Sequence, residues 1–290
     1  MVRRLQGEFE VSERRACRVV NQSRSSQRYE PQPRSDEPAL SKRMVQLAGE
    51  RPRFGYRRIA WRLRREGWRA SDTRIYRLWR REGLKVPKKR RKRRGLGGSR
   101  NSCSVRRADH KDHVWCWDFA FDRTISGSQL KWLTIVDEHT RECLALKVDR
   151  GITSEDVIDT LAKLFATRGV PKAIRSDNGP EFIAEAIQDW LRQLDIEALY
   201  VQPGSPWENG YAESFYSRLR DEFLEVEQFE NLRAARMLTR EWRDDYNHER
   251  PHSSLGYVPP AEYAVLCATS ASATPSLQQH TENVHQPDSS

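Results

Sequence analysis

The hydrophobic pattern of this chain changes partway along from a helical to a strand-like period. In the first part, apolar residues recur every three or four positions, as on one face of an amphipathic helix. Two such helices follow each other between residues 39 and 83, one carrying Ile59 and Leu63 and the next carrying Ile75 and Leu78. Two short helices with a tight connection and arginines on their outer faces are typical of a helix-turn-helix.

Polar residues mark the starts of the helices predicted in this first part. Ser12 and Ser23 each precede a short helical pattern, and Ser71 or Asp72 can cap the second helix of the helix-turn-helix. These side chains suit a helix start because they accept hydrogen bonds from its first, unpaired N–H groups. The prolines between residues 31 and 38 then mark a linker. The front of the chain is therefore predicted to be a small all-α region.

Beyond the change of period, alternating residues predict strands. From Val114 to Asp122 an aromatic residue occupies every second position, as in a strand with one aromatic face. Ser154 is the predicted cap of the first helix in this part, and the segment 137–142 reads as a polar turn. Further strands are predicted at 130–136, 143–148, 173–175 and 198–201, with helices after residues 154, 180 and 207. The order of three strands, helix, strand, helix, strand and helix matches an α/β, ribonuclease-H-like fold, a mixed five-stranded sheet with flanking helices.

Basic residues are concentrated at the front. Residues 1–110 contain 33 Lys and Arg against 11 Asp and Glu, whereas residues 111–290 contain 18 against 30. This asymmetry is typical of a nucleic-acid-binding part joined to a more acidic globular body. Lys85–Arg94 has eight basic residues in ten, so we expect an extended tether that binds phosphates without reading sequence. The alternative for the arginine-rich helices is a solvated helical pair, and the alternative for the basic run is a solvated linker, neither of which binds DNA. The candidate DNA contacts are Arg57, Arg58, Arg74, Arg77, Lys88, Lys89, Arg90 and Arg91.

Cysteine usage and hydropathy argue against several classes of protein. The five cysteines are scattered without a Cys-x-x-Cys pair, so we expect a reduced, cytoplasmic protein without a zinc ribbon or disulfide framework. His110 and His113 have a His-x-x-His spacing, but no second ligand pair follows, and we interpret them as polar residues near a domain edge. No segment approaches about 18 consecutive apolar residues, so no membrane partner is expected.

Three carboxylates stand out in the second part of the chain. Asp118 lies in the aromatic strand, Asp177 opens a turn after a predicted strand, and Glu213 lies on a predicted helix. Thirty-five residues separate the last two. Three carboxylates that converge from separate elements repel one another unless a divalent cation neutralises them. Such a site can hold two Mg²⁺ ions and carry out phosphodiester chemistry.

Other acidic residues compete for the same role. Asp122 shares the strand face of Asp118 but lies roughly 13 Å along it, too far to serve the same metal pair. Glu181 and Glu208 fall in the first turns of predicted helices, where the helix dipole favours an acidic residue. Glu213 borders an apolar stripe, and we expect it to face inward at the rim of the core.

Four motifs together resemble a known family. They are SDNGPEF at 176–182, PGSPWENGYAESF at 203–215, LRDEF at 219–223 and YNHERPHSSLGYVPPAEY at 246–263. In combination they are similar to the second-reading-frame product of insertion-sequence transposases of the IS-three family, relatives of retroviral integrases, over about residues 34–263. The resemblance implies a D,D-35-E triad at Asp118, Asp177 and Glu213 that holds two Mg²⁺ ions, with Mn²⁺ able to substitute. Many relatives have Asn-Gly where this chain has Tyr216-Ser217, which leaves local DNA contacts open.

The resemblance also implies a function and partners. The function is metal-dependent DNA strand cleavage and strand transfer during transposition, with element ends and target DNA as substrates. The expected state is a homo-oligomer on DNA, in a cytoplasmic, nucleoid-associated protein. The first thirty-five residues have no leucine-zipper heptad, an element that belongs to the family's first-reading-frame product, so that product is a further expected partner or fusion. Candidate DNA-contacting or site-supporting residues are Arg218, Arg220, Arg250 and His252.

Two other functions are alternatives to transposition. A DNA-binding regulator of transposition without activity of its own is the main alternative, although the intact triad argues against it. A ribonuclease H or simple nuclease explains neither the basic front nor the segment ENGYAESF. The predicted segments are a short helical segment at 1–33, a helix-turn-helix-like domain at 34–84, a basic linker at 85–110, a catalytic core with C-terminal helices at 111–265 and a disordered tail at 266–290.

Overall fold

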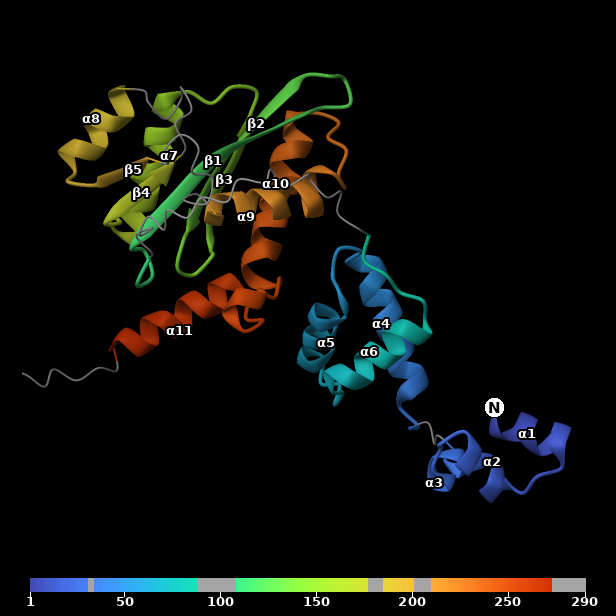
Figure 1. The fold of residues 1–290 in the computed structure, drawn as a ribbon. Helices are drawn as coiled ribbons and strands as arrows, with labels where there is room; N and C mark the ends of the chain where they lie inside the picture. The colour runs from blue at the N-terminus through green and yellow to red at the C-terminus, as the bar shows by residue number, and fades with distance from the viewer. Residues whose placement is uncertain (31–33, 88–107, 177–184, 201–209, 273–290) are drawn as a thin grey trace, which may run out of the picture. The chain divides into compact units, whose positions relative to one another are not determined.

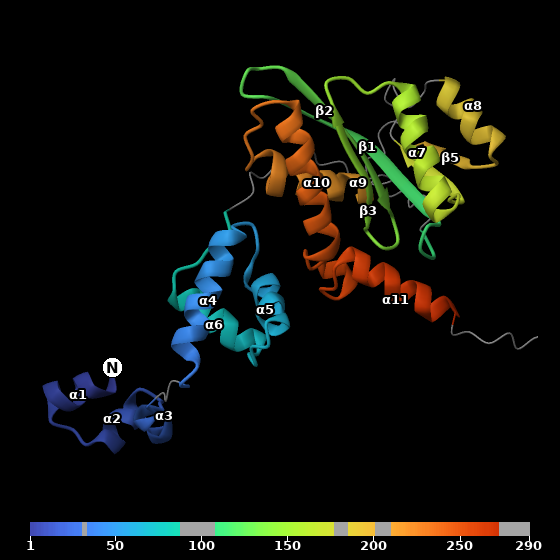
Figure 2. The same ribbon diagram turned by 180° about the vertical axis from the view of Figure 1, so that it is seen from behind.

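The structure is a computed structural model that describes residues 1–30, 34–87, 108–176, 185–200 and 210–272 (Figures 1 and 2). The chain divides into two compact units, residues 1–86 and 87–290. In the described residues, every helix is too short or too polar to cross a lipid bilayer.

Three short helices open the first unit: α1 (Val2–Phe9), α2 (Glu13–Val19) and α3 (Arg24–Arg28). Ser12 and Ser23 cap α2 and α3, as predicted, by accepting hydrogen bonds from backbone N–H groups three residues on. Helix α1 falls in the segment predicted to be helical, although the sequence did not mark its bounds, and it packs through Val2 and Leu5 on the cluster that contains Ala16 and Cys17. Within α2 the burial of apolar residues is uneven, since Ala16 is fully buried and Val19 is 71% exposed.

Three longer helices complete the first unit: α4 (Glu37–Glu50), α5 (Tyr56–Arg65) and α6 (Asp72–Arg81). They enclose one apolar cluster, to which α4 contributes Leu40 and Met44, α5 contributes Ile59, and α6 contributes Leu78. Ser71 is the cap of α6, because its side chain accepts a hydrogen bond from the Arg74 N–H. The predicted pair of helices with a tight connection is confirmed.

The second unit is built on a five-stranded sheet in the order β3-β2-β1-β4-β5. Neighbouring pairs β1–β2 and β2–β3 are antiparallel, whereas β4 is parallel to both β1 and β5. The strands are β1 (Val114–Arg123), β2 (Gln129–Asp137), β3 (Cys143–Asp149), β4 (Ala173–Ser176) and β5 (Glu197–Tyr200). The sheet therefore confirms the predicted mixed, ribonuclease-H-like order of strands.

Helices cover both faces of this sheet (Figures 1 and 2). On one face lie α7 (Ser154–Arg168) and α8 (Glu185–Gln193). The other face carries α9 (Gly210–Leu219), the π-helical turn η2 (Arg220–Leu224) and α10 (Leu232–His248). The short 3-10 turn η3 (Ser253–Leu255) and helix α11 (Pro260–Ser272) follow.

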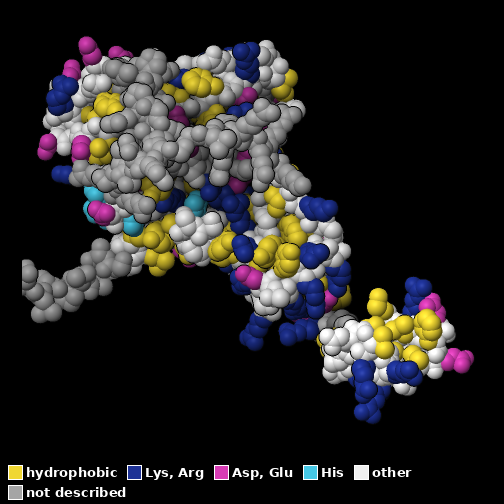
Figure 3. Space-filling view, viewed as in Figure 1, with side chains coloured by type: hydrophobic (Ala, Val, Ile, Leu, Met, Phe, Trp, Pro, Cys, Tyr) yellow, Lys and Arg dark blue, Asp and Glu magenta, His cyan; other side chains and the backbone are white. Residues whose placement is uncertain are grey.

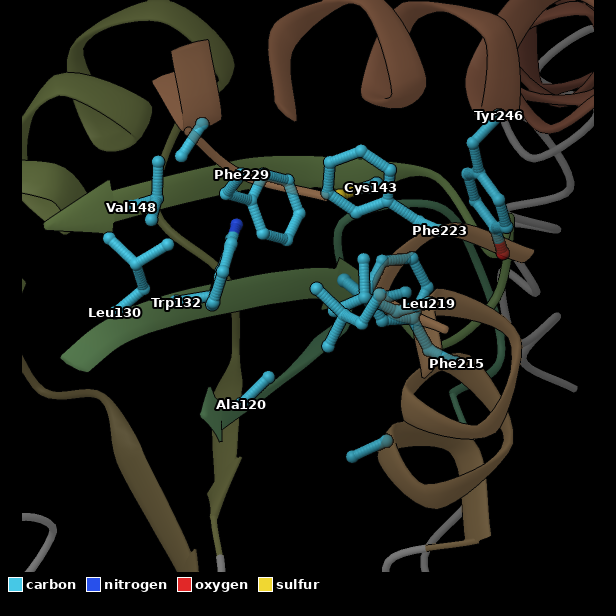
Figure 4. Close-up of a cluster of buried hydrophobic side chains, with 14 of the residues drawn as sticks. Ala120, Leu130, Trp132, Cys143, Val148, Phe215, Leu219, Phe223, Phe229 and Tyr246 are labelled. Atoms are coloured by element: carbon cyan, nitrogen blue, oxygen red, sulfur yellow. The ribbon is translucent and has the colours of Figure 1, made fainter. Parts of the chain in front are cut away.

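The alternation along β1 separates two cores. Its aromatic side chains, Trp115, Trp117 and Phe119, join the core under α7 and α8. Cys116 and Ala120 point the other way, into the core that contains Phe215 and Leu219 of α9 with Trp132, Phe229 and Tyr246 (Figure 4). Both sides of β1 are buried because helices cover both faces of the sheet.

Two predictions about this unit need correction. The cap of α7 is Thr153, not Ser154, because Thr153 and Asp156 exchange the reciprocal hydrogen bonds of a capping box. Residues 266–272, assigned to a disordered tail, belong to α11. This helix begins at a proline, and its alanines and Leu266 have high helix propensity. The remainder of the predicted tail, 273–290, lies outside the described residues.

Candidate active site

Asp118 lies in the middle of the central strand and is partly buried. Its neighbours on the same strand face, Cys116 and Ala120, belong to the core under α9, so Asp118 points toward the side that α9 covers. Thr134 lies opposite it on β2 and donates a 3.0 Å hydrogen bond from its hydroxyl to the Asp118 carbonyl. The Asp118 carboxylate accepts a 2.7 Å hydrogen bond from the Phe119 N–H, which orients it.

Glu213 lies in the first turn of α9 and is exposed. This differs from the inward-facing position that the sequence predicted, because Ala212 and Phe215 occupy the buried stripe and each is 3% exposed. Helix α9 contacts β1 directly. Glu213 is therefore carried on the sheet face to which Asp118 points, and its carboxylate is open to solvent.

Asp177 follows β4 in the sequence and lies outside the described residues, as do the rival carboxylates Glu181 and Glu208. The strand before Asp177 is described: it runs parallel to β1, with Arg175 opposite Cys116. Since Cys116 precedes Asp118 by two positions, β4 ends beside the part of β1 that carries Asp118.

The rival carboxylate on β1 lies at a different place on the sheet. Asp122 is opposite Leu130, near the end of the β1–β2 hairpin. Its carboxylate accepts a 2.8 Å hydrogen bond from the N–H of Arg123. Asp122 thus lies near the end of the strand, away from Asp118.

The connection between β2 and β3, residues 137–142, is largely buried rather than a solvated turn. Asp137 accepts hydrogen bonds from the N–H groups of Asp112, His139 and Thr140 at 2.5, 2.7 and 2.8 Å. These bonds compensate the burial of its carboxyl group, whose pKa is nevertheless raised by desolvation. The polar composition of segment 137–142 predicts exposure to solvent. The hydrogen-bond partners that allow its burial are seen only in the folded structure.

The same connection holds the end of β4. Glu138 and Arg175 form a buried ion pair with 2.7 Å between Oε1 and Nε, and they are 1% and 5% exposed. Burial raises the pKa of Glu138, an effect that the Arg175 charge opposes. Reasoning from the sequence missed both residues, although an arginine inside a short buried strand calls for a buried acidic partner.

Two of the proposed DNA contacts lie at the end of α9. Arg218 is half-buried and donates hydrogen bonds to the carbonyl oxygen of Ser214 at 2.5 Å and to its hydroxyl. Desolvation, and then the neighbouring charge of Arg250, lower the pKa of Arg218. Arg220 is exposed and forms a 3.2 Å ion pair with exposed Glu225. Arg220 is thus the more accessible of the two.

The two candidates in the Arg-Pro-His motif are buried. Arg250 is 2% exposed, and its Nε and Nη2 atoms donate to both carboxylate oxygens of Glu222 at 2.6 and 2.7 Å. His252 is 5% exposed, and its Nδ1 lies 2.9 Å from the Ser254 hydroxyl. In this structure both side chains are buried and hydrogen-bonded within the protein, and their two predicted roles, DNA contact or support of the site, stay predictions.

The arginines of the front unit differ in accessibility. Arg57 is exposed, with its guanidinium 5.4 Å from the centre of the Tyr56 ring. Arg58 is half-buried and lies over Phe54 at 5.2 Å. Basic side chains gather on the surface of this unit (Figure 3). The candidates Lys88, Lys89, Arg90 and Arg91 lie outside the described residues.

Acidic partners on α4 and at its start engage two other candidates. The Arg74 side chain is 9% exposed and donates to both carboxylate oxygens of Asp36 at 3.0 and 2.6 Å. This pairing makes Arg74 less accessible than the other candidate phosphate contacts of this unit. Arg77 is 64% exposed despite its 2.6 Å pair with Glu37. It remains accessible to a polyanion.

The donor chemistry fits a hard divalent cation. In the part of the chain that the structure describes, no group of three His, Cys, Asp or Glu side chains is gathered as a metal site. Asp118 and Glu213 supply carboxylate oxygens to one side of the sheet, and Asp177 would complete an all-oxygen set of the kind Mg²⁺ prefers.

The two histidines with His-x-x-His spacing contact each other. The His110 and His113 rings stack at 4.6 Å, and His113 accepts a hydrogen bond from the Asp109 N–H.

Comparison with protein families divides the chain in the same way as its fold. An HTH-like domain matches residues 35–93, and two integrase core domain models match residues 108–206 and 194–260. Among solved structures, the integrase catalytic core domain of HTLV-2 in complex with magnesium has a TM-score of 0.43 at 16% identity, covering 55% of this chain and 99% of that one. A simian T-cell lymphotropic virus intasome has a TM-score of 0.47 at 17% identity, covering 85% and 80%.

Relatives from bacterial insertion elements are more similar in sequence. A protein of insertion element IS407 from Burkholderia multivorans is 41% identical over 93% of this chain and 96% of its own length. A protein of insertion element IS476 from Xanthomonas euvesicatoria is 40% identical over 91% and 75%. Transposase InsD for insertion element IS2D from Escherichia coli is 29% identical over 79% of each chain. The chain therefore belongs to the IS-three family of insertion-element transposases, in which a helix-turn-helix-like domain precedes an integrase core of ribonuclease-H-like fold.

Proposed function

We propose that this protein is a DDE-type DNA transposase that cleaves DNA strands and transfers them during transposition of an insertion sequence. The observation that carries this proposal is the arrangement of the integrase core. Asp118 lies on the central strand, β4 ends beside it directly before Asp177, and α9 carries Glu213 on the same sheet face. Both α9 and β4 contact β1, and a metal-dependent phosphodiester site requires carboxylates that converge from separate elements in this way.

The register of the two central strands supports the role of Asp177. Arg175 is opposite Cys116. Strand β4 therefore ends beside the part of β1 that carries Asp118, and Asp177 is the next residue in the sequence after β4. Carboxylates brought together from separate elements repel one another unless a cation binds between them. We assign the metal ligands to Asp118, Asp177 and Glu213.

Each ligand has a separate task in this mechanism. Asp118 is a metal ligand whose carboxylate is held in place on the central strand by a hydrogen bond from the Phe119 N–H. Glu213, exposed in the first turn of α9, supplies a second carboxylate from the helix that packs on this face of β1. Two Mg²⁺ ions, or Mn²⁺ in their place, supply activation of the attacking oxygen and charge stabilisation at the leaving 3′-oxygen when bound.

Element ends and target DNA are the proposed substrates. The helix-turn-helix-like domain at 34–84 and the linker at 85–110 are assigned to DNA binding, with Arg57, Arg58, Arg77 and the run Lys88–Arg91 as phosphate contacts. Arg220 is assigned to DNA beside the core. We further propose that the chain acts as a homo-oligomer on DNA in the bacterial cytoplasm, together with or fused to a first-reading-frame product.

A strand-transfer assay tests this function. The substrate is an oligonucleotide that contains the element end, with Mg²⁺ and the full chain or its frame-fused form. Asp177→Asn should abolish cleavage and transfer and leave DNA binding intact. Asp122→Asn is the matched control, because Asp122 shares the strand of Asp118 but lies near the hairpin end. The control should keep its activity.

Two outcomes would contradict the proposal. Full activity in Asp177→Asn would remove Asp177 from the metal site. An inactive frame-fused wild-type protein that still binds element ends would favour the regulator without activity of its own.

A further inference from the structure

The first turn of α9 needs support from outside the helix. Glu213 lies in this turn, which begins at Gly210. The first N–H groups of any helix have no partners within it. A helix as short as α9 is also marginal by itself. The position of Glu213 therefore depends on tertiary contacts made by the residues beside it.

Arg141 provides such a contact from a distant part of the sequence. Its guanidinium carbon lies 3.8 Å from the centre of the Tyr211 ring, a close cation–π stack. Tyr211 is half-buried in the same helical turn as Glu213. The next residue, Ala212, is 3% exposed and packs in the core with Cys116 and Ala120 of β1. Arg141 thus packs on the turn of α9 that carries Glu213, the proposed metal ligand.

Arg141 is itself held in a fixed conformation. Its φ of +64° lies in the left-handed region, which is rare outside glycine and persists only where surrounding contacts impose it. Its N–H donates to the Asp137 carbonyl at 2.9 Å, and its carbonyl accepts from the Tyr246 hydroxyl at 3.2 Å. Its Nη1 donates to the Glu138 carbonyl. These bonds aim the guanidinium at α9 rather than at solvent.

The connection that contains Arg141 also reaches the other side of the site. Glu138, three residues earlier, forms the buried ion pair with Arg175. Arg175 lies on β4, two positions before Asp177. A single segment, 137–142, therefore contacts both the strand that leads to Asp177 and the helix that carries Glu213.

We propose that Arg141 is a positioning residue, which fixes the first turn of α9 so that Glu213 is set for metal binding beside Asp118. Arg141 touches neither metal nor DNA in this role and acts through Tyr211. The inference rests on the proposed function for its activity readout. Its structural readout is independent of that function.

Hydrogen exchange of the metal-free full chain gives the structural readout. Arg141→Ala should speed exchange of the α9 amides about tenfold, the size of a partly desolvated cation–π contact, and leave α7 unchanged. Tyr211→Leu should act alike, whereas Tyr211→Phe keeps the ring and should match the wild type. Arg236→Ala is the matched control, because Arg236 also joins a helix to the sheet, through Asp149 on β3. It should leave α9 unchanged.

Strand cleavage gives the second readout. Arg141→Ala should lower the maximal rate and raise the Mg²⁺ concentration for half-maximal rate several-fold, because Glu213 must be ordered by the metal itself. Arg141→Lys, which keeps the charge, should recover part of the loss. The double variant Arg141→Ala with Tyr211→Leu should lose no more than either single change, because both remove the same contact.

Several results would overturn the proposal. Unchanged α9 exchange in Arg141→Ala would do so, as would an equal rise of exchange in α7, which indicates general destabilisation. Additive losses in the double variant would mean that Arg141 does not act through Tyr211. A wild type without strand transfer would refute the proposed function and leave the exchange result to decide the role of Arg141 in ordering α9.

Discussion

The buried ion pair between Arg250 and Glu222 allows a quantitative prediction. Glu222 lies in the π-helical turn that continues α9, and Arg250 follows α10. The Arg250 side chain is 2% exposed and that of Glu222 is 14% exposed. The two hydrogen bonds between them are short, at 2.6 and 2.7 Å. We consider the change Glu222→Gln, which keeps the shape of the side chain and removes its charge.

The expected loss follows from the burial of Arg250. The glutamine amide is not charged, so the guanidinium stays buried without the carboxylate that accepts its two hydrogen bonds. Removing one partner of a buried pair typically costs about 3–5 kcal/mol. In a unit of this size, about 1 kcal/mol shifts the melting temperature by about 2–4 °C, so we expect a fall of at least about 6 °C.

The unfolding of this unit can be followed locally. Trp242 stacks on Phe223, next to Glu222 in the sequence, and on Tyr246, with ring centres 5.6 and 5.2 Å apart. Denaturation should be monitored by hydrogen exchange of α10, because tryptophans of both units contribute to the fluorescence of the chain. The double variant Glu222→Gln with Arg250→Met removes both charges and should recover at least half of the loss. A cost below about 1 kcal/mol, or a double variant less stable than either single variant, would refute the reasoning.

Three further predictions concern other parts of the chain. Trp132→Phe should lower the free energy of unfolding by about 1–3 kcal/mol, because it leaves the buried Thr239 hydroxyl without the indole N–H that donates to it at 2.9 Å; unchanged stability in chemical denaturation would contradict this. The Asp156 carboxylate accepts a hydrogen bond from Lys147, which lowers its pKa to about 2 from 3.8. Its contribution to stability should therefore be complete above about pH 4 and disappear as the pH falls toward 2, and the stability difference between wild type and Asp156→Asn should shrink over that range. Arg57→Ala should weaken DNA binding equally for all sequences and reduce the salt dependence of the logarithm of affinity by about one unit; a selective loss at element ends would indicate base contact instead.

Much of the fold could be predicted because its signals are local. Strand and helix periods in the second unit depend on residues a few positions apart, and they specify the order of β1 to β5 and α7 to α9 correctly. The errors fall where the local signals are weak or fit two neighbouring residues equally well. Thr153 and Ser154 are both suitable caps, and helix α1 depends on the packing of Val2 against a later helix.

The candidate site was predictable only in part. The motifs around Asp118 and Glu213 are dense enough to single these residues out, but their exposure depends on which helix stripe fills the core. Charged residues were the main difficulty. Arg74 and Arg250 are arginines in segments where DNA contacts are expected. In the structure each forms a bidentate pair with a carboxylate far away in the sequence. A sequence pattern cannot reveal such a partner.

The sequence by itself determined the order of elements, the separation of a basic front from an acidic body, and membership of the transposase family. These depend on residue identity and on spacing along the chain. Only the tertiary structure decided which arginines are buried, and only it revealed that the segment 137–142 reaches both β4 and α9. The physical reason is that an ion pair or a cation–π stack forms between side chains that folding brings together. The separation of two residues along the sequence does not show whether their side chains meet.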